Sequence, residues 1–163
     1  MSKKKIFMNR AAHLVDIENQ IGSPRCSPHE IEQWFDYYSQ TVNLGRFDIV
    51  IFGVTNIHNA FSVKASGVPA RIIPKFGPDG ADLALQDVME HENLPGRFAR
   101  VYCASGDGGF ADHVSRLAAS VPVLVVARKS ALSKRLEIAA TSVVVLAEVT
   151  RNEEAAAALR LAS

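Results

Sequence analysis

The chain has 163 residues, of which 48% are hydrophobic and 21% charged, and its formal net charge is +1 at pH 7. This length and composition are typical of one globular domain. The near-neutral charge excludes binding of nucleic acid through overall basicity, because contacts with a phosphate backbone then require a local patch of Lys and Arg.

The cysteines, the histidines and the termini exclude several further classes. Cys26 and Cys103 provide neither a disulfide framework nor the spacing of a zinc site, and we expect Cys103 to be buried in an apolar strand. The five histidines lack metal-ligand spacing, and we expect each of them at the surface or in a loop. No apolar run is long enough to cross a bilayer, and polar residues interrupt the basic N-terminus before any signal-like segment. The expectation is a cytoplasmic protein without a membrane partner.

Apolar runs and amphipathic segments alternate along the chain. Helix starts are marked by two capping boxes, Ser27-Pro28-His29-Glu30 and Thr150-Arg151-Asn152-Glu153, and by Asn56. The pattern predicts strands at 12–17, 47–54, 70–75, 100–105, 121–127 and 142–146. It predicts helices around 28–38, 57–66, 81–91, 110–117, 130–140 and 151–161.

The strands are apolar throughout and do not alternate with polar residues, which is typical of a parallel sheet covered by helices on both faces. We therefore predict an α/β fold, a three-layer α/β/α sandwich with a mainly parallel central sheet. One domain spans residues 1–163, with a core from about 12 to 147 and a C-terminal helix at about 151–161.

Four aspartates are predicted to meet at one edge of this sheet. Asp16 ends the first strand, and Asp107 follows the fourth strand. Asp82 lies in the first turn of the helix after the third strand, and Asp112 lies about one turn into the helix after Asp107. The carboxyl ends of parallel strands share one edge, where open α/β sheets place their ligand sites. Oxygen ligands of this kind favour Mg²⁺ or Mn²⁺, which would relieve the repulsion between the carboxylates.

Each acid also has a purely structural interpretation. Asp16 is placed to accept hydrogen bonds from loop amides, Asp82 to interact with a helix start, and Asp112 to be solvated in a first helical turn. Asp107, which is followed by two glycines, is the acid that a structural role explains least. Asp87, further along the helix of Asp82, is expected either to be solvated or to support the site from behind its ligands. The scattered cations form either a phosphate-facing patch or separate solvated charges: Lys64, Arg71, Lys75, Arg128, Lys129, Lys134 and Arg135.

Three motifs in order resemble those of NYN domains, a branch of the PIN-like nuclease superfamily. The first is Val15-Asp16-Ile17-Glu18-Asn19, and the second is Gly80-Ala81-Asp82-Leu83-Ala84-Leu85-Gln86-Asp87. The third is Ser105-Gly106-Asp107-Gly108-Gly109-Phe110, in which Gly109 stands where the family often has a second Asp. The order and spacing agree over roughly residues 12–147.

The resemblance implies a ribonuclease that uses Mg²⁺ or Mn²⁺ to hydrolyse phosphodiester bonds of RNA. Asp16, Asp82, Asp107 and Asp112 would be its catalytic residues and metal ligands, with Asp112 compensating for Gly109. Asn19, Ser105 and Lys75 are the residues expected to contact the substrate, and Asn19 would hydrogen-bond Asp16 or a phosphate. The partner would be RNA, and the sequence leaves a homodimer open.

Two other functions remain open on the sequence. A haloacid-dehalogenase-like phosphohydrolase would use Asp16, Thr55 and the pair Asp107 and Asp112, although Glu18 stands where that family has a second Asp. A non-catalytic RNA-binding or regulatory protein would explain both Gly109 and the near-neutral charge.

Overall fold

The computed structural model describes residues 9–148 and residue 161. Its centre is a single parallel sheet in which six strands have the order β3-β2-β1-β4-β5-β6. The strands are β1 (Ala11–Asp16), β2 (Ile49–Val54), β3 (Arg71–Pro74), β4 (Arg100–Ala104), β5 (Val123–Arg128) and β6 (Ser142–Leu146).

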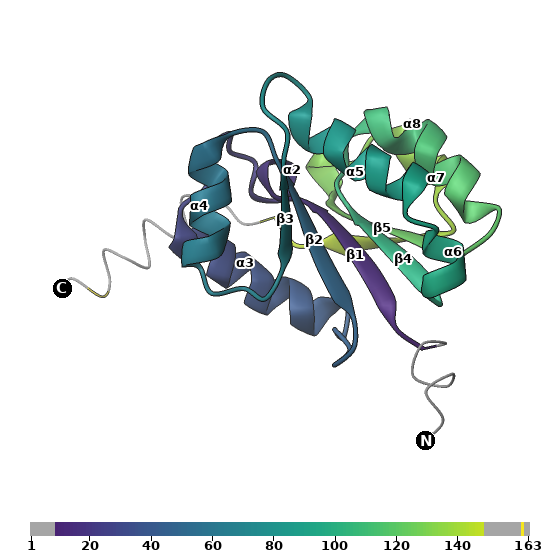
Figure 1. The fold of residues 1–163 in the computed structure, drawn as a ribbon, viewed down its shortest axis with the longest axis horizontal. Helices are drawn as coiled ribbons and strands as arrows, with labels where there is room; N and C mark the ends of the chain where they lie inside the picture. Colours follow the sequence, from purple (N-terminus) through teal and green to yellow (C-terminus); the bar gives the residue numbers. More distant parts are fainter. Residues whose placement is uncertain (1–8, 149–160, 162–163) are drawn as a thin grey trace.

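Helices cover both faces of the sheet, so the expected three-layer α/β/α sandwich is confirmed (Figure 1). One face packs against α2 (Ile17–Ile21), α3 (Pro28–Thr41) and α4 (Ile57–Ala65). The other face packs against α5 (Gly80–His91), α6 (Leu94–Arg97), α7 (Ala111–Ala118) and α8 (Lys134–Ala139). Two short 3₁₀ turns, η1 (Gly108–Phe110) and η2 (Lys129–Ala131), precede α7 and α8.

Local sequence explains where these helices begin. The Ser27 hydroxyl accepts a hydrogen bond from the Glu30 amide at 3.1 Å, and Pro28 occupies the first helical position of α3. The Asn56 side chain accepts one from the Asn59 amide at 2.8 Å at the start of α4. Both predicted caps are confirmed, while the capping box at residues 150–153 and the helix expected at 151–161 lie outside the described residues, apart from residue 161.

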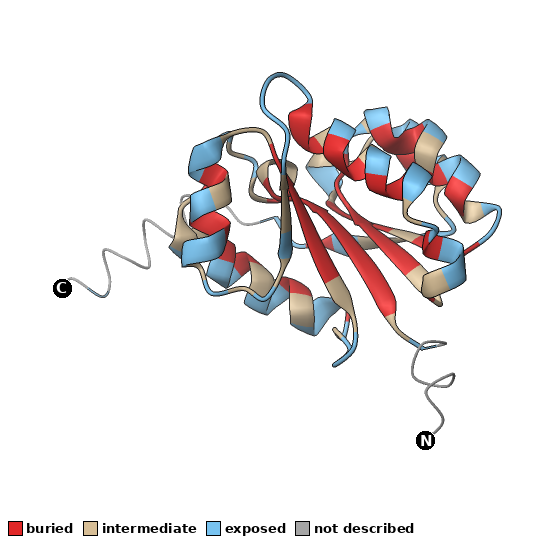
Figure 2. Cartoon of the chain, in the orientation of Figure 1, coloured by how far each residue is buried: buried red, intermediate tan, exposed pale blue. Residues whose placement is uncertain are grey.

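The hydrophobic core consists of two layers, one on each side of the sheet. Alternate residues of β1 enter opposite layers, Leu14 beneath α5 and α7 and Val15 beneath α2 and α3. Figure 2 shows the buried residues as a continuous band along the central strands, with exposed residues on the outer surfaces of the helices. Cys103 is fully buried in β4, as expected. Each fully buried large aliphatic side chain contributes about 1.5–3 kcal/mol.

The structure corrects the sequence-based expectations in several places. Residues 17–21 form α2, although the sequence indicated a strand end and a loop there, and the helix expected at 130–140 is confined to 134–139. The short helix α6 was not expected. The assignment of all histidines to the surface or loops is wrong for His13, which is fully buried within β1. Within the described residues, no helix is both long and apolar enough to cross a membrane.

Candidate active site

The strand order reverses direction between β1 and β4, and such a topological switch point opens a crevice at the carboxyl ends of the two strands. Asp16 is the last residue of β1, and Ser105, Gly106 and Asp107 directly follow β4. Asp82 approaches the same place from the first turn of α5. Backbone topology therefore brings together residues that lie far apart in the sequence.

Asp16 is held in a fixed position by its neighbours. Its carboxylate caps α2 by accepting a hydrogen bond from the Asn19 amide at 3.3 Å. The Ser105 hydroxyl donates to the other carboxylate oxygen at 3.0 Å and accepts from the Asp107 amide at 3.2 Å. Ser105 is fully buried and Asp16 is 5% exposed. Ser105 thus links the ends of β1 and β4 and positions Asp16, a placement that differs from the direct substrate contact expected from the sequence.

Asp82 and Asp107 complete a cluster of three carboxyl groups. Asp107 caps η1, because its Oδ1 accepts a hydrogen bond from the Gly109 amide at 2.8 Å. Asp82 shares a side-chain hydrogen bond with Asp16. Within the described residues, none of these three carboxylates forms an ion pair with Lys or Arg. Among the described residues, no Lys or Arg therefore compensates the negative charge of this cluster.

Crowding of these groups changes how they titrate. Burial, followed by the charges of Asp16 and Asp107, raises the pKa of Asp82 to about 7. Burial also raises the pKa of Asp16 to about 6, against the hydrogen bonds from Asn19 and Ser105, which lower it. The contact between the two carboxyls couples their titration, and burial raises the pKa of both.

Gly109 faces this cluster. A Cβ atom on Gly109 would lie 3.2 Å from Asp107 Oδ1 and 3.8 Å from Asp82 Oδ2. The position at which NYN motifs often carry a second Asp therefore lies close to both Asp82 and Asp107 in this structure. The glycine places no further carboxylate there, and a Cβ would be in tight contact with Asp107.

Asn19 and Glu18 support the site from α2. The Asn19 side-chain oxygen accepts a hydrogen bond from the Gly106 amide at 2.8 Å, so it links α2 to the segment after β4. Glu18 Oε1 accepts hydrogen bonds from the Asn59 side chain at 2.7 Å, from the Thr55 amide at 3.3 Å and from the Thr55 hydroxyl. Thr55, which a dehalogenase-like mechanism would need, is thus bound to Glu18.

Two of the expected site residues lie elsewhere. The Asp112 carboxylate is 68% exposed and pairs with Arg135 at 2.7 Å. Lys75 Nζ lies 3.2 Å from the Asp87 carboxylate, and both side chains are exposed, which agrees with the solvated position expected for Asp87. Neither contact includes a carboxylate of the central cluster. The structure therefore brings together Asp16, Asp82 and Asp107, with Asn19 and Ser105 behind them.

The carboxylates of this site can be compared with the ligands that Mg²⁺ and Mn²⁺ prefer. Among the described residues, no three His, Cys, Asp or Glu side chains are arranged to hold a metal ion. Mg²⁺, however, usually binds through one or two carboxylates and keeps several waters that substrate phosphates can replace. Asp16 and Asp82 supply two neighbouring carboxylates of this kind. The chemistry of these donors fits Mg²⁺ or Mn²⁺.

Comparison with known proteins shows the fold alone. No protein-family model matches the chain, and a search of curated proteins found no similar sequence. The chain is similar to the crystal structure of a protein of unknown function from Vibrio parahaemolyticus, with a TM-score of 0.60 and 19% sequence identity. The match covers 91% of this chain and 97% of the other.

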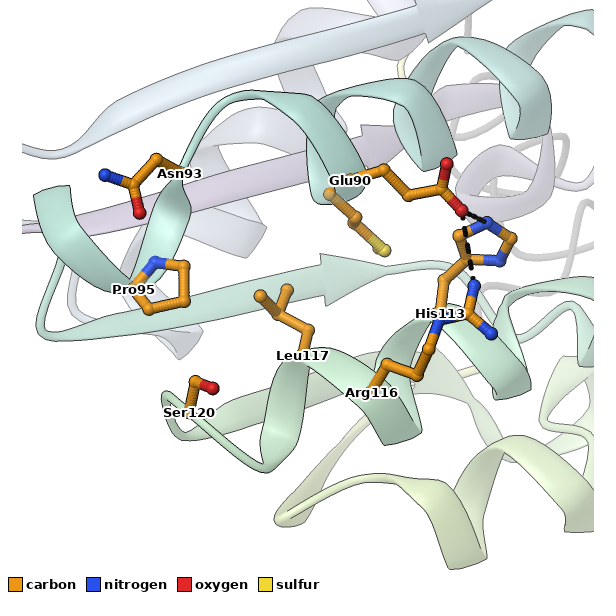
Figure 3. A pocket seen from close by; sticks show the side chains of 8 residues that line it. Glu90, Asn93, Pro95, His113, Arg116, Leu117 and Ser120 are labelled. Atoms are coloured by element: carbon orange, nitrogen blue, oxygen red, sulfur yellow. Dashed lines mark hydrogen bonds and ion pairs between the residues drawn. The ribbon is translucent and has the colours of Figure 1, made fainter.

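Two hollows lie away from the acidic cluster. The first, of about 370 Å³, is open toward solvent between α5, α6 and α7. In Figure 3 the Glu90 carboxylate faces both His113 and Arg116, at distances of 2.7 and 3.2 Å. The second hollow, of about 520 Å³, lies between β3 and α5 and is bordered by Arg71 and Lys75. Their charged residues are already paired with one another.

Sequence reasoning missed two acids that act on the cluster. In addition to burial, the charge of Glu18 raises the pKa of Asp16, and the charge of Asp79 raises that of Asp82. Asp79 immediately precedes α5 in the left-handed region, with φ of 58°. Its position in the turn Gly77-Pro78-Asp79-Gly80, just before Asp82, was a usable signal. No local pattern indicated that Glu18 would bind Thr55 and Asn59.

Proposed function

We propose that this protein is a metal-dependent ribonuclease related to NYN domains, hydrolysing phosphodiester bonds of RNA with Mg²⁺ or Mn²⁺. The observation that carries the proposal is the group formed by Asp16, Asp82 and Asp107 at the switch point, without a compensating Lys or Arg among the described residues. Such a concentration of negative charge destabilises a fold unless a cation or a proton offsets it.

In this proposal Asp16 and Asp82 hold the metal, whose chemistry at such sites is polarisation of the phosphate and activation of water. Ser105 and the Asn19 amide fix the Asp16 carboxylate, which limits its movement. Asp82 has a pKa of about 7 without a metal, so binding of the cation would compete with its protonation near neutral pH. Asp107 is exposed beside Gly109 and adds its negative charge to that of the pair.

The test is cleavage of a labelled single-stranded RNA in Mn²⁺, with and without a chelator. Asp107→Asn keeps the size of the side chain and removes its charge, and we expect it to reduce the rate at least about 100-fold. Asp36→Asn, on the exposed side of α3, is the matched control and should leave the rate unchanged. Asp112→Asn should also retain most activity, because Asp112 pairs with Arg135. Full cleavage by Asp107→Asn, or cleavage that survives chelation, would contradict the proposal.

One observation favours a second candidate, a non-catalytic RNA-binding protein. Gly109 places no carboxylate at the position between Asp82 and Asp107 where NYN motifs often carry a second Asp. Retention of RNA without cleavage in either metal, at protein concentrations well above those of the RNA, would favour this candidate.

A further inference from the structure

One large aromatic side chain stands exposed next to the acidic edge. Phe76 is 65% exposed and belongs to the loop between β3 and α5, three residues before Asp79 and six before Asp82. Figure 1 shows this loop, drawn in teal, rising above the carboxyl edge of the sheet beside the start of α5. Phe76 takes no part in either layer of the hydrophobic core.

The loop that carries Phe76 is held at both ends. The Lys75 amide donates a hydrogen bond to the Val54 carbonyl at 3.0 Å, and the Gly80 amide donates to the Gly77 carbonyl at 3.1 Å. Gly80 packs so closely on the Lys75 carbonyl that a Cβ at residue 80 would lie 1.6 Å from that oxygen. The backbone around Phe76 is therefore already ordered, and contact between a ligand and its ring costs little conformational entropy.

Basic residues lie on the other side of the cluster. The Ser133 amide donates a hydrogen bond to the Gly106 carbonyl at 2.8 Å, which ties the start of α8 to the segment that carries Asp107. Lys129 and Lys134 are exposed beside this contact, and Lys134 is only loosely paired with Glu137, at 3.6 Å. In the strand order, β1 and β4, which carry Asp16 and Asp107 at their ends, lie between β3, followed by the Phe76 loop, and β5, followed by Lys129 and Lys134.

The chemistry of this arrangement suits an unpaired nucleotide. A nucleobase stacks on a single aromatic ring, and cations elsewhere along the strand bind its phosphates. A protein partner would need a much larger surface, on the order of 1,000 Å² in total. Lys75, Gly77, Pro78 and Asp79 flank Phe76 and supply no such continuous apolar area. Bases in a duplex are stacked and paired, so their faces are not available to Phe76.

We propose that Phe76 stacks on an unpaired base of the substrate and thereby restricts this site to single-stranded RNA. The inference rests on the proposed ribonuclease function, because the strand must cross the acidic cluster. Phe76 is a specificity-determining residue in this arrangement and has no part in bond cleavage.

The experiment measures binding of a fluorescently labelled ten-nucleotide RNA, as a single strand and as a duplex, in an Asp107→Asn background. Phe76→Ala should raise the Kd for the single strand about 5- to 150-fold, and Phe76→Tyr should retain tight binding. Phe47→Ala is the matched control, because Phe47 is 52% exposed and precedes β2 at the opposite edge of the sheet. A base analogue whose fluorescence is quenched by stacking, placed at each position in turn, should be quenched by the protein with Phe76 intact and not by the Phe76→Ala variant.

The outcomes separate this inference from the proposed function. Binding that depends on Phe76, in a protein that cleaves no RNA even with Asp107 intact, supports the inference and contradicts the ribonuclease proposal. If Phe76→Ala leaves cleavage unaffected, and the Kd for the single strand is the same with and without this substitution, the inference is overturned. The proposed ribonuclease function is then unaffected. A loss of affinity that is equal for the single strand and the duplex also overturns it.

Discussion

At the scale of single residues, Asp82 determines how stability depends on pH. Its pKa is about 7 in the folded protein, against an ordinary value of 3.8, so the folded state holds the proton more tightly than the unfolded chain does. Stability is therefore highest below about pH 4 for this group and falls as pH rises to about 7. The ionised cluster is a local source of instability at neutral pH when no cation is bound.

Asp82→Asn should remove this penalty. Because solvent screens the half-buried carboxyl, the gain is smaller than the full pKa shift implies, and we expect about 1–2 kcal/mol at pH 8. The corresponding rise in Tm is roughly 2–8 °C. Thermal unfolding in EDTA checks this, with a gain expected at pH 8 and almost none at pH 4. An equal gain at both pH values would show that packing, and not charge, is responsible.

The central acids could be predicted from the sequence because they depend on position in a strand. Asp16 and Asp107 follow apolar runs, and a parallel sheet puts both at one edge. The contacts of Ser105 and Asp112 could not be predicted in this way. Whether Ser105 is buried behind Asp16, and whether Asp112 reaches Arg135, depends on side-chain directions that spacing in the sequence does not specify.

At the scale of elements, the conformation of η1 determines whether a side chain at residue 109 would face the acidic cluster. This turn presents residue 109 toward Asp82 and Asp107, and the φ of Gly109 is not positive, so a side chain is sterically accessible there. The 3.2 Å approach to Asp107 Oδ1 requires that carboxylate to move by a few tenths of an ångström. A negatively charged residue at 109 would give the cluster an additional oxygen ligand.

Gly109→Asp should strengthen binding of Mn²⁺ on the order of tenfold, or about 1.4 kcal/mol, because affinity rises with the number of charged ligands. Isothermal titration calorimetry with Mn²⁺ measures this. Gly109→Asn is the matched control, having nearly the same shape without the charge. If both variants bind Mn²⁺ equally, the added charge does not reach the ion and the assignment of this site to a metal is in error.

Element boundaries were less predictable than element types. All six strands were predicted, but β2 begins at Ile49 and not at Phe47, and β5 is shifted from 121–127 to 123–128. The short helices α2 and α6 were missed, since five and four residues are too few for a recognisable helical period. Asp16 caps α2 with its side chain, so the same residue ends the strand and starts the helix.

At the scale of the whole molecule, the two edges of the sheet have different tasks. The carboxyl edge carries the acids. The amino edge of the same sheet is stabilised by a buried polar network. His13 donates to or accepts from the Tyr38 hydroxyl at 2.8 Å and lies 3.0 Å from the Asp48 carboxylate, which precedes β2. Burial lowers the pKa of His13. The sequence did not reveal this network, because a histidine within a strand resembles a surface residue until its partners are known.

Asp48 accepts hydrogen bonds from three groups at this edge. Burial alone would raise its pKa, but hydrogen bonds from His13, Ala11 and Gly45 lower it to about 2. A carboxyl whose pKa is depressed on folding contributes stability above about pH 4, and that contribution is lost as pH falls through about 2. Its side chain is 3% exposed, and its removal leaves the buried His13 ring and the Ala11 amide without this acceptor.

Asp48→Ala should therefore reduce the free energy of unfolding by about 3 kcal/mol at pH 7. Tyr38→Phe, which removes one hydroxyl from the same network, should cost only about 1 kcal/mol. Urea denaturation at pH 7 measures both variants, and the effect of Asp48→Ala should shrink toward pH 2. RNA cleavage per folded molecule should stay unchanged in both variants, since Asp48 and the acidic cluster lie at opposite edges of the sheet. A loss of cleavage without a loss of stability would show that the two edges are coupled.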